Sequence, residues 1–203
     1  METTKTMPLS KKITYFSILT AITVILQFIG GYLKIGAVNI NLTLVPLVLC
    51  GMILGVWYSL ALGAVIGLVI LIQGITGLEP FTFALFNANP VLLSFICILK
   101  TTLAGGAGAL VYKLLKFKNK YVATFISAGV VPVINTGVFV LGMLFFETPM
   151  RDFLAGLGLN TDGFSVVYVI LVVVVTWNFF IEFAINLFLA PAIYRVIKII
   201  GKN

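Results

Sequence analysis

The chain has 203 residues, 61% hydrophobic and 9% charged, which excludes a soluble domain because so much apolar surface could not be buried in one. The net charge of +7 does not indicate nucleic-acid binding, because the few basic residues cluster at the ends of apolar segments, as topology signals do. The chain has no histidine and no Gly-x-x-x-x-Gly-Lys-Ser/Thr loop, so a histidine metal site and ATP binding by such a loop are excluded, and we expect no metal or cofactor.

Six apolar segments predict an all-α integral membrane protein with six transmembrane helices in one domain. The uncharged stretch Asn39–Thr76 would be about 55 Å long as a single helix. Because the hydrocarbon core of a bilayer is only about 30 Å thick, this stretch must cross twice. We place the break at Gly55, just before Trp57 and Tyr58, which are typical of the membrane interface. The predicted spans are about 13–30, 40–54, 57–76, 89–115, 121–146 and 164–194.

The connections between these spans are short. Residues 30–36 predict a flexible loop, and residues 149–155 predict a short surface helix. Gly63 and Gly67 lie four residues apart and predict a flat helix face for close packing. An aromatic segment precedes the fourth span; we interpret it as an interface anchor, with a ligand lid as the alternative. Its residues are Phe81, Phe83 and Phe86.

The basic residues predict the orientation. Six spans place both termini on the same side of the membrane, and ten of the 13 Lys and Arg residues fall on that side. By the positive-inside rule, that side is cytoplasmic. The ten are Lys5, Lys11, Lys12, Lys113, Lys116, Lys118, Lys120, Arg195, Lys198 and Lys202.

Several polar residues lie inside the predicted spans, where they are costly and often functional. Counted along each helix from its cytoplasmic end, Lys100 and Glu182 both lie about 18 Å deep, Asn135 about 21 Å and Asn178 about 24 Å. Asn178, Glu182 and Asn186 are spaced four apart and form one stripe, which we interpret as facing a cavity or other helices. The alternative is hydrogen bonding that only holds the bundle together. For Lys100 and Glu182, a structural ion pair is an equal alternative to ligand contact.

These residues predict a binding site in the outer half of the bundle, between spans four, five and six. Amide side chains would contact the ligand, a tryptophan would form a flat wall, two further asparagines would close the mouth, and the two charged residues would form the floor. The ligand-contacting amides are Asn135 and Asn178, and the wall is Trp177. The mouth is closed by Asn87 and Asn89, and the floor is formed by Lys100 and Glu182.

Three segments carry a resemblance to a known family: Ile40–Ile72, Leu110–Leu115 and Pro132–Gly137. With six spans, a basic N-terminus and about 200 residues, the chain resembles the substrate-binding S component of an energy-coupling factor (ECF) vitamin transporter over nearly its whole length. One departure is Gly55-Val56, where many members have Gly-Pro; both make a tight turn.

The resemblance implies a high-affinity binding subunit of an ATP-driven importer in the plasma membrane of a prokaryote, with no ATPase of its own. It implies partners as well: a transmembrane coupling subunit and two cytoplasmic ATPase subunits. The family's first helix often docks on the coupling subunit through small residues spaced four apart. Ser17 and Ala21 match that spacing, with Ser in place of the usual first Ala.

The substrate implied is a water-soluble vitamin or a precursor. An amide-rich pocket suits hydroxyl, amide or carboxylate groups, and pantothenate is a candidate. A stand-alone secondary transporter of a small polar solute, with Lys100 and Glu182 as a coupling pair, is the alternative. The absence of histidine and of paired carboxylates argues against a membrane enzyme.

Overall fold

The computed structural model describes residues 7–32, 34–35 and 38–200. Lys5 and Lys202, and part of the predicted loop at 30–36, lie outside the described residues. The helices are α1 (Leu9–Tyr32), α2 (Leu44–Leu54), α3 (Val56–Ile75), α4 (Pro80–Ala88), α5 (Pro90–Leu115), α6 (Lys120–Met143), α7 (Glu147–Gly156), α8 (Val166–Tyr168) and α9 (Thr176–Ile200). A π-helical segment, η1 (Val169–Val175), joins α8 to α9, and β1 (Lys34–Ile35) pairs antiparallel with β2 (Val38–Asn39).

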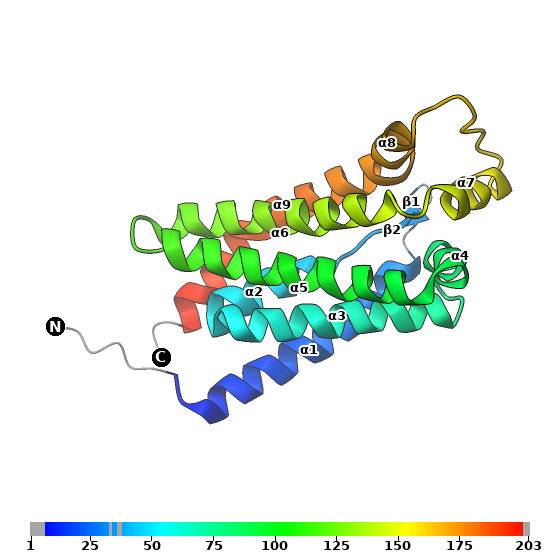
Figure 1. Cartoon of the computed structure of the whole chain (residues 1–203). Coiled ribbons are helices and arrows are strands. Elements are labelled where there is room, and N and C mark those ends of the chain that lie inside the picture. The colour runs from blue at the N-terminus through cyan, green and yellow to red at the C-terminus, as the bar shows by residue number, and fades with distance from the viewer. Residues whose placement is uncertain (1–6, 33, 36–37, 201–203) are drawn as a thin grey trace.

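The helices form an elongated bundle with two different ends (Figure 1). The start of α1, the junction of α2 with α3, the connection from α5 to α6 and the end of α9 lie at one end, which we call the basic end. The β1–β2 hairpin, α4, α7 and α8 lie at the other end. The basic end carries Lys11, Lys12, Lys113, Lys116, Lys118, Lys120, Arg195 and Lys198.

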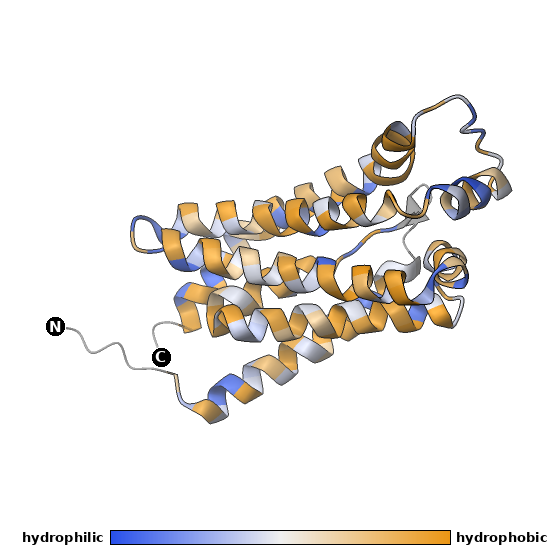
Figure 2. Cartoon of the chain, in the orientation of Figure 1, coloured by the Kyte–Doolittle hydropathy of each residue, from blue (hydrophilic) through white to orange (hydrophobic). Residues whose placement is uncertain are grey.

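Apolar residues run along the shafts of the long helices (Figure 2). Among the described residues, five helices are long and apolar enough to cross a membrane: α1, α3, α5, α6 and the continuous helix Val166–Ile200. The apolar helix α2 is shorter, with 11 residues. The predicted all-α membrane protein of about six helices is therefore confirmed.

The second predicted span starts later than expected. The chain breaks at Gly55, whose φ of 94° is a conformation that favours glycine, but residues 40–43 are not helical. The chain instead runs from β2 to α2 as a non-helical segment through the bundle (Figure 1). Its polar residues alternate with Ile40 and Leu42, a two-residue period typical of extended chain. The helix predicted at 40–43 is absent, because this two-residue period favours extended chain over helix.

Close packing of α3 on α5 depends on small residues. A Cβ added at Gly67 would lie 2.5 Å from the Cα of Ile98, so only glycine lets the two backbones approach this closely. The Thr101 hydroxyl donates a hydrogen bond of 2.6 Å to the carbonyl of Gly63, which links the same two helices. Two further hydroxyls bind α5 to its neighbours: Ser59 to the Gly105 carbonyl (3.0 Å) and Ser127 to the Gly108 carbonyl (2.8 Å).

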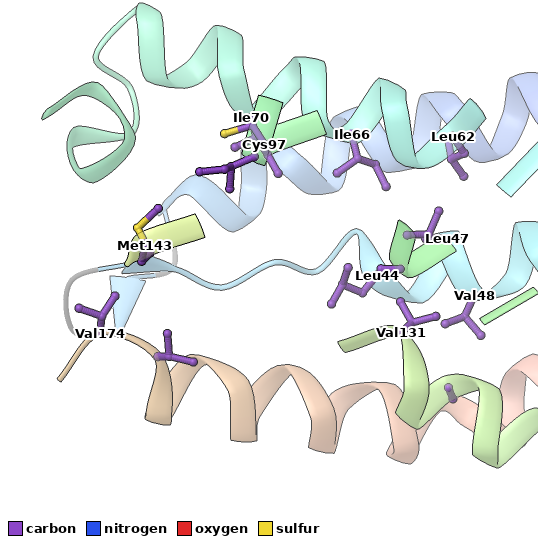
Figure 3. Close-up of a cluster of buried hydrophobic side chains, with 14 of the residues drawn as sticks. Leu44, Leu47, Val48, Leu62, Ile66, Ile70, Cys97, Val131, Met143 and Val174 are labelled. Atoms are coloured by element: carbon purple, nitrogen blue, oxygen red, sulfur yellow. The ribbon is translucent and has the colours of Figure 1, made fainter. Parts of the chain in front are cut away.

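A cluster of buried apolar side chains fills the space between α2, α3 and α6 (Figure 3). Leu44 and Leu47 of α2, Leu62 and Ile66 of α3, and Val131 of α6 are all fully buried. The short helix α2 is therefore held in the bundle by burial of its apolar side chains against α3 and α6.

The last helix is interrupted by a change of winding. The helix Val166–Ile200 contains 35 residues, and its π-helical segment η1 lies next to the polar residues of α9. The Thr176 hydroxyl donates to the carbonyl of Leu171, five residues earlier, which matches the wider π winding. Such segments occur frequently at functional sites.

Candidate functional site

A cavity lies among the helices beneath α4. Its internal volume is about 70 Å³, smaller than the usual range of about 300–1,000 Å³ for small-molecule sites. Its polar lining consists of Gln27, Asn39, Asn41, Glu79, Thr82, Lys100, Asn135, Thr136, Asn178 and Glu182. Its apolar lining consists of Ile40, Ile70, Phe81, Phe139, Val174, Val175 and Phe179. So many polar groups inside an apolar bundle indicate a site for a polar molecule.

The polar stripe of α9 divides into two parts. Asn178 and Glu182 line the cavity and are 7% and 6% exposed. Asn186 lies one turn further on and is not part of the lining; its side-chain amide donates to the carbonyl of Glu182 at 2.8 Å. The cavity interpretation therefore fits the first two residues, and the structural alternative fits the third.

Glu182 also holds the non-helical segment in place. Its Oε1 accepts a hydrogen bond of 2.8 Å from the backbone N–H of Asn41. The Asn41 Oδ1 in turn accepts from the backbone N–H of Thr43 at 3.1 Å and from the Thr43 hydroxyl. A chain that leaves helical geometry inside a membrane must satisfy its backbone groups in this way.

Lys100 extends from α5 into the same cavity. Its Nζ lies 4.8 Å from the centroid of the Phe139 ring, in the geometry of a cation–π contact. Lys100 and Glu182 therefore line the same cavity.

Two amide oxygens in the lining are buried without a hydrogen-bond partner among the described residues. Asn135, on α6, is 5% exposed, and its Oδ1 has no partner. On α1, the amide nitrogen of Gln27 donates to Oε1 of Gln73 at 2.9 Å, while the Gln27 Oε1 has no partner. Both oxygens are thus available to a donor on a bound molecule.

The helix α4 covers the cavity. Its Phe81 is 1% exposed, contacts Phe153 edge-to-face at 5.3 Å and lies 6.4 Å from Phe139, so this aromatic belongs to the lining. Phe83 is 42% exposed and points away from the core, as an interface anchor would. Glu79 is the N-cap residue of α4, and its Oε2 accepts a hydrogen bond of 2.6 Å from the backbone N–H of Thr82.

Three of the predicted site residues lie outside the cavity. Trp177 is 66% exposed on the outside of α9, because successive residues of a helix point about 100° apart and its neighbour Asn178 faces inward. Asn87 and Asn89 are exposed at the end of α4. The Asn89 Oδ1 caps α5 by accepting the Leu92 backbone N–H at 3.1 Å. None of the three is part of the cavity lining.

The predicted docking residues lie on the outer face of α1. Ser17 and Ala21 are exposed, as are their neighbours Ile18 and Ile25, whereas Leu19 faces the core. Only 17% of the most apolar part of this helix is buried inside the bundle. The face is therefore open to lipid or to another protein.

The sequence reading missed several lining residues. Gln27 carries a signal, since it is a lone amide in an apolar helix, and Asn39 and Asn41 carry one in their alternation with apolar residues. Phe139 is one of many apolar residues in α6, and no local pattern marks it as part of a site.

Comparison with known proteins places the chain in a family. A search of curated proteins found no match. The family model of the ECF transporter substrate-specific component matches residues 11–194, which include every cavity-lining residue named above. The family consists of transporter components, and the chain is a multi-pass membrane protein of this type. The chain therefore belongs to the substrate-specific components of ECF transporters.

Proposed function

We propose that this protein is the high-affinity binding subunit of an ATP-driven importer for a water-soluble vitamin or precursor. The observation that carries the proposal is the polar cavity beneath α4, placed away from the basic end of an otherwise apolar bundle. The cavity supplies amides, carboxylates and one ammonium, which suit a small polar solute rather than a lipid.

The proposed orientation follows from charge. The lysine-rich basic end faces the cytoplasm of a prokaryotic cell, and the cavity beneath α4 opens toward the outside of the plasma membrane. An impermeant thiol reagent applied to intact cells should therefore label an introduced Asn160→Cys and leave Lys118→Cys unlabelled. The opposite labelling pattern would reverse the orientation.

The proposed partners are a transmembrane coupling subunit and two ATPase subunits, with Ser17 and Ala21 on the contact face. Both residues are small and exposed, so a partner helix can approach closely. Ala21→Trp should block assembly and spare ligand binding. Ile22→Trp, at a large exposed residue that lies about 100° around the helix from Ala21, is the matched control. Normal recovery of the complex with Ala21→Trp would place the contact elsewhere.

Pantothenate is our candidate substrate, because it combines one carboxylate with hydroxyl and amide groups. The proposed contacts are Lys100, Asn135, Asn178 and Glu182, which line one cavity. Radiolabelled pantothenate should enter ATP-loaded proteoliposomes only when this chain and a complete coupling module are both present. Uptake driven by the chain alone would support the stand-alone transporter instead. Mass spectrometry of small molecules released from the purified protein identifies the ligand independently.

A further inference from the structure

We propose that Gln27 of α1 is a further ligand-binding residue, and that its pairing with Gln73 makes it an acceptor that selects solutes carrying a hydrogen-bond donor. This inference rests on the proposed function, because it adds a contact and a selectivity to the site of the binding subunit. Three features carry it: the position of Gln27 in the cavity wall, the orientation that Gln73 gives its amide, and the buried oxygen that remains.

The first feature is the position of Gln27. It lies near the end of α1 that is away from the basic end, and it lines the cavity. Three residues later, a Cβ added at Gly30 would lie 2.6 Å from the carbonyl oxygen of Ile40, so glycine lets α1 pack closely against the non-helical segment. Ile40 lines the same cavity. The backbone that carries Gln27 is thus held against another wall of the site.

The second feature is the orientation of the amide. An amide side chain offers N–H donors at one atom and an acceptor at the other, so its role depends on how its neighbours hold it. The backbone carbonyl of Gln27 can only accept, and it receives a hydrogen bond of 3.4 Å from Nε2 of Gln73. Gln73 Oε1 then accepts from Nε2 of Gln27 at 2.9 Å. These two bonds turn the Gln27 nitrogen toward α3.

The partner in these bonds is not itself a ligand contact. Gln73 is 3% exposed and does not belong to the cavity lining. It is therefore a positioning residue, which fixes the amide of Gln27 from behind and leaves the Gln27 oxygen as the group presented to a solute.

The third feature is that remaining oxygen. Gln27 Oε1 is buried and has no hydrogen-bond partner among the described residues. A buried acceptor without a donor is destabilising, and an O–H or N–H on the solute removes that penalty. A solute that places an ether oxygen or a methyl group there leaves the penalty in place. Gln27 therefore distinguishes solutes by the presence of a donor at one position.

Calorimetric titration of the full chain in nanodiscs tests the inference. The probes are pantothenate, biotin, thiamine and riboflavin, each of which carries O–H or N–H donors. The vitamin that binds most tightly is compared with derivatives in which one O–H or N–H at a time is methylated. We expect one methylated derivative to bind the wild type about 30-fold more weakly than its parent. Gln27→Met, which keeps the side-chain length without the amide, should bind the parent and that derivative equally.

Two further variants separate the contact from general damage. Thr23→Val is the matched control, because Thr23 lies four residues before Gln27 on the same helix face, is 1% exposed and is not part of the lining. It should keep both the affinity and the preference for the parent. Gln73→Met leaves Gln27 intact but frees its amide to rotate and donate to an ether oxygen, so the 30-fold preference should shrink to about fivefold.

The outcomes distinguish the inference from the proposed function. If the wild type binds every methylated derivative as tightly as the parent, or if Gln27→Met keeps the full preference, the inference is overturned and binding of the vitamin leaves the proposed function standing. Loss of affinity in Thr23→Val as large as in Gln27→Met also overturns it. Failure of all four vitamins to bind overturns the inference and the proposed function together.

Discussion

The interface between α3 and α5 differs from the surroundings of the cavity in how its polar groups are satisfied. In the interface of α3 with α5, glycines bring backbones together and hydroxyls bind carbonyls of the neighbouring helix, as Thr101 binds Gly63. Around the cavity, a non-helical segment crosses the bundle, and the amide oxygen of Asn135 has no hydrogen-bond partner within the described parts of the chain. The first region is too closely packed to accept larger side chains, whereas the second has a hydrogen-bond acceptor that the described part of the protein does not satisfy. A rigid interface beside an incompletely bonded cavity is the arrangement expected of a binding protein.

The largest effect should come from the glycine interface. Gly67→Ala places a Cβ 2.5 Å from the Ile98 backbone and should destabilise the fold by about 3 kcal/mol. The apparent unfolding temperature in detergent should fall by about 10 °C. Gly137→Ala is the matched control on α6, because an added Cβ there meets nothing within 4 Å. Equal behaviour of the two variants would remove the distinction between the two regions.

The next largest effect should be on binding. Asn135→Ala and Asn178→Ala each remove a lining amide and should weaken binding of radiolabelled pantothenate by about 2 kcal/mol, or roughly 30-fold. Trp177→Ala, at the outward-facing neighbour of Asn178, should leave the dissociation constant within about twofold, because side chains outside a site contribute little. If Trp177→Ala weakens binding and the asparagine variants do not, the cavity is not the site.

A smaller and local effect is expected at Glu182. Glu182→Gln replaces a charge-assisted hydrogen bond to the Asn41 N–H by a neutral one, at a cost of about 1.4 kcal/mol. Amide hydrogen exchange in the peptide that contains Asn41 should become about tenfold faster. Glu147→Gln changes an exposed acid on α7 and should not affect that peptide. Unchanged exchange in Glu182→Gln would mean that apolar packing alone holds the segment.

The smallest effect should come from Asn89. Asn89→Ala removes the N-cap of α5 and should lower stability by about 1 kcal/mol without changing ligand affinity. Asn87→Ala, at an exposed neighbour, is the control and should change neither quantity. Loss of ligand binding in Asn89→Ala would return this residue to the mouth of the site.

The long helices could be predicted from the sequence because runs of apolar residues and the glycine at 55 are local signals. The depths of Asn135 and Asn178 could also be estimated, since rise per residue is constant, and both residues line the cavity. Depth does not determine direction around the helix axis, however, so it could not show that Trp177 faces outward while Asn178 faces the cavity. Asn89 caps α5, and a capping asparagine and a ligand-binding one look alike in a sequence.

Other parts of the cavity depend on contacts between distant segments. Gln27 and Phe139 reach the cavity only because α1 and α6 lie against it, and that packing follows from tertiary structure. The hydrogen bond between Asn41 and Glu182 joins residues 141 positions apart, so no local sequence pattern predicts it.

The non-helical segment before α2 has a consequence for how the chain is made. Residues 38–43 emerge from the ribosome long before α9, yet the Asn41 amide finds its acceptor only on that last helix. An unsatisfied amide is poorly tolerated in hydrocarbon. The early hairpin of α2 and α3 must therefore wait in a wetter or partly inserted state until synthesis is complete. We expect truncation before Glu182 to leave α2 and α3 accessible to the cell's membrane quality-control proteases. The non-helical segment thus makes folding of the first half of the chain depend on synthesis of the last helix, α9.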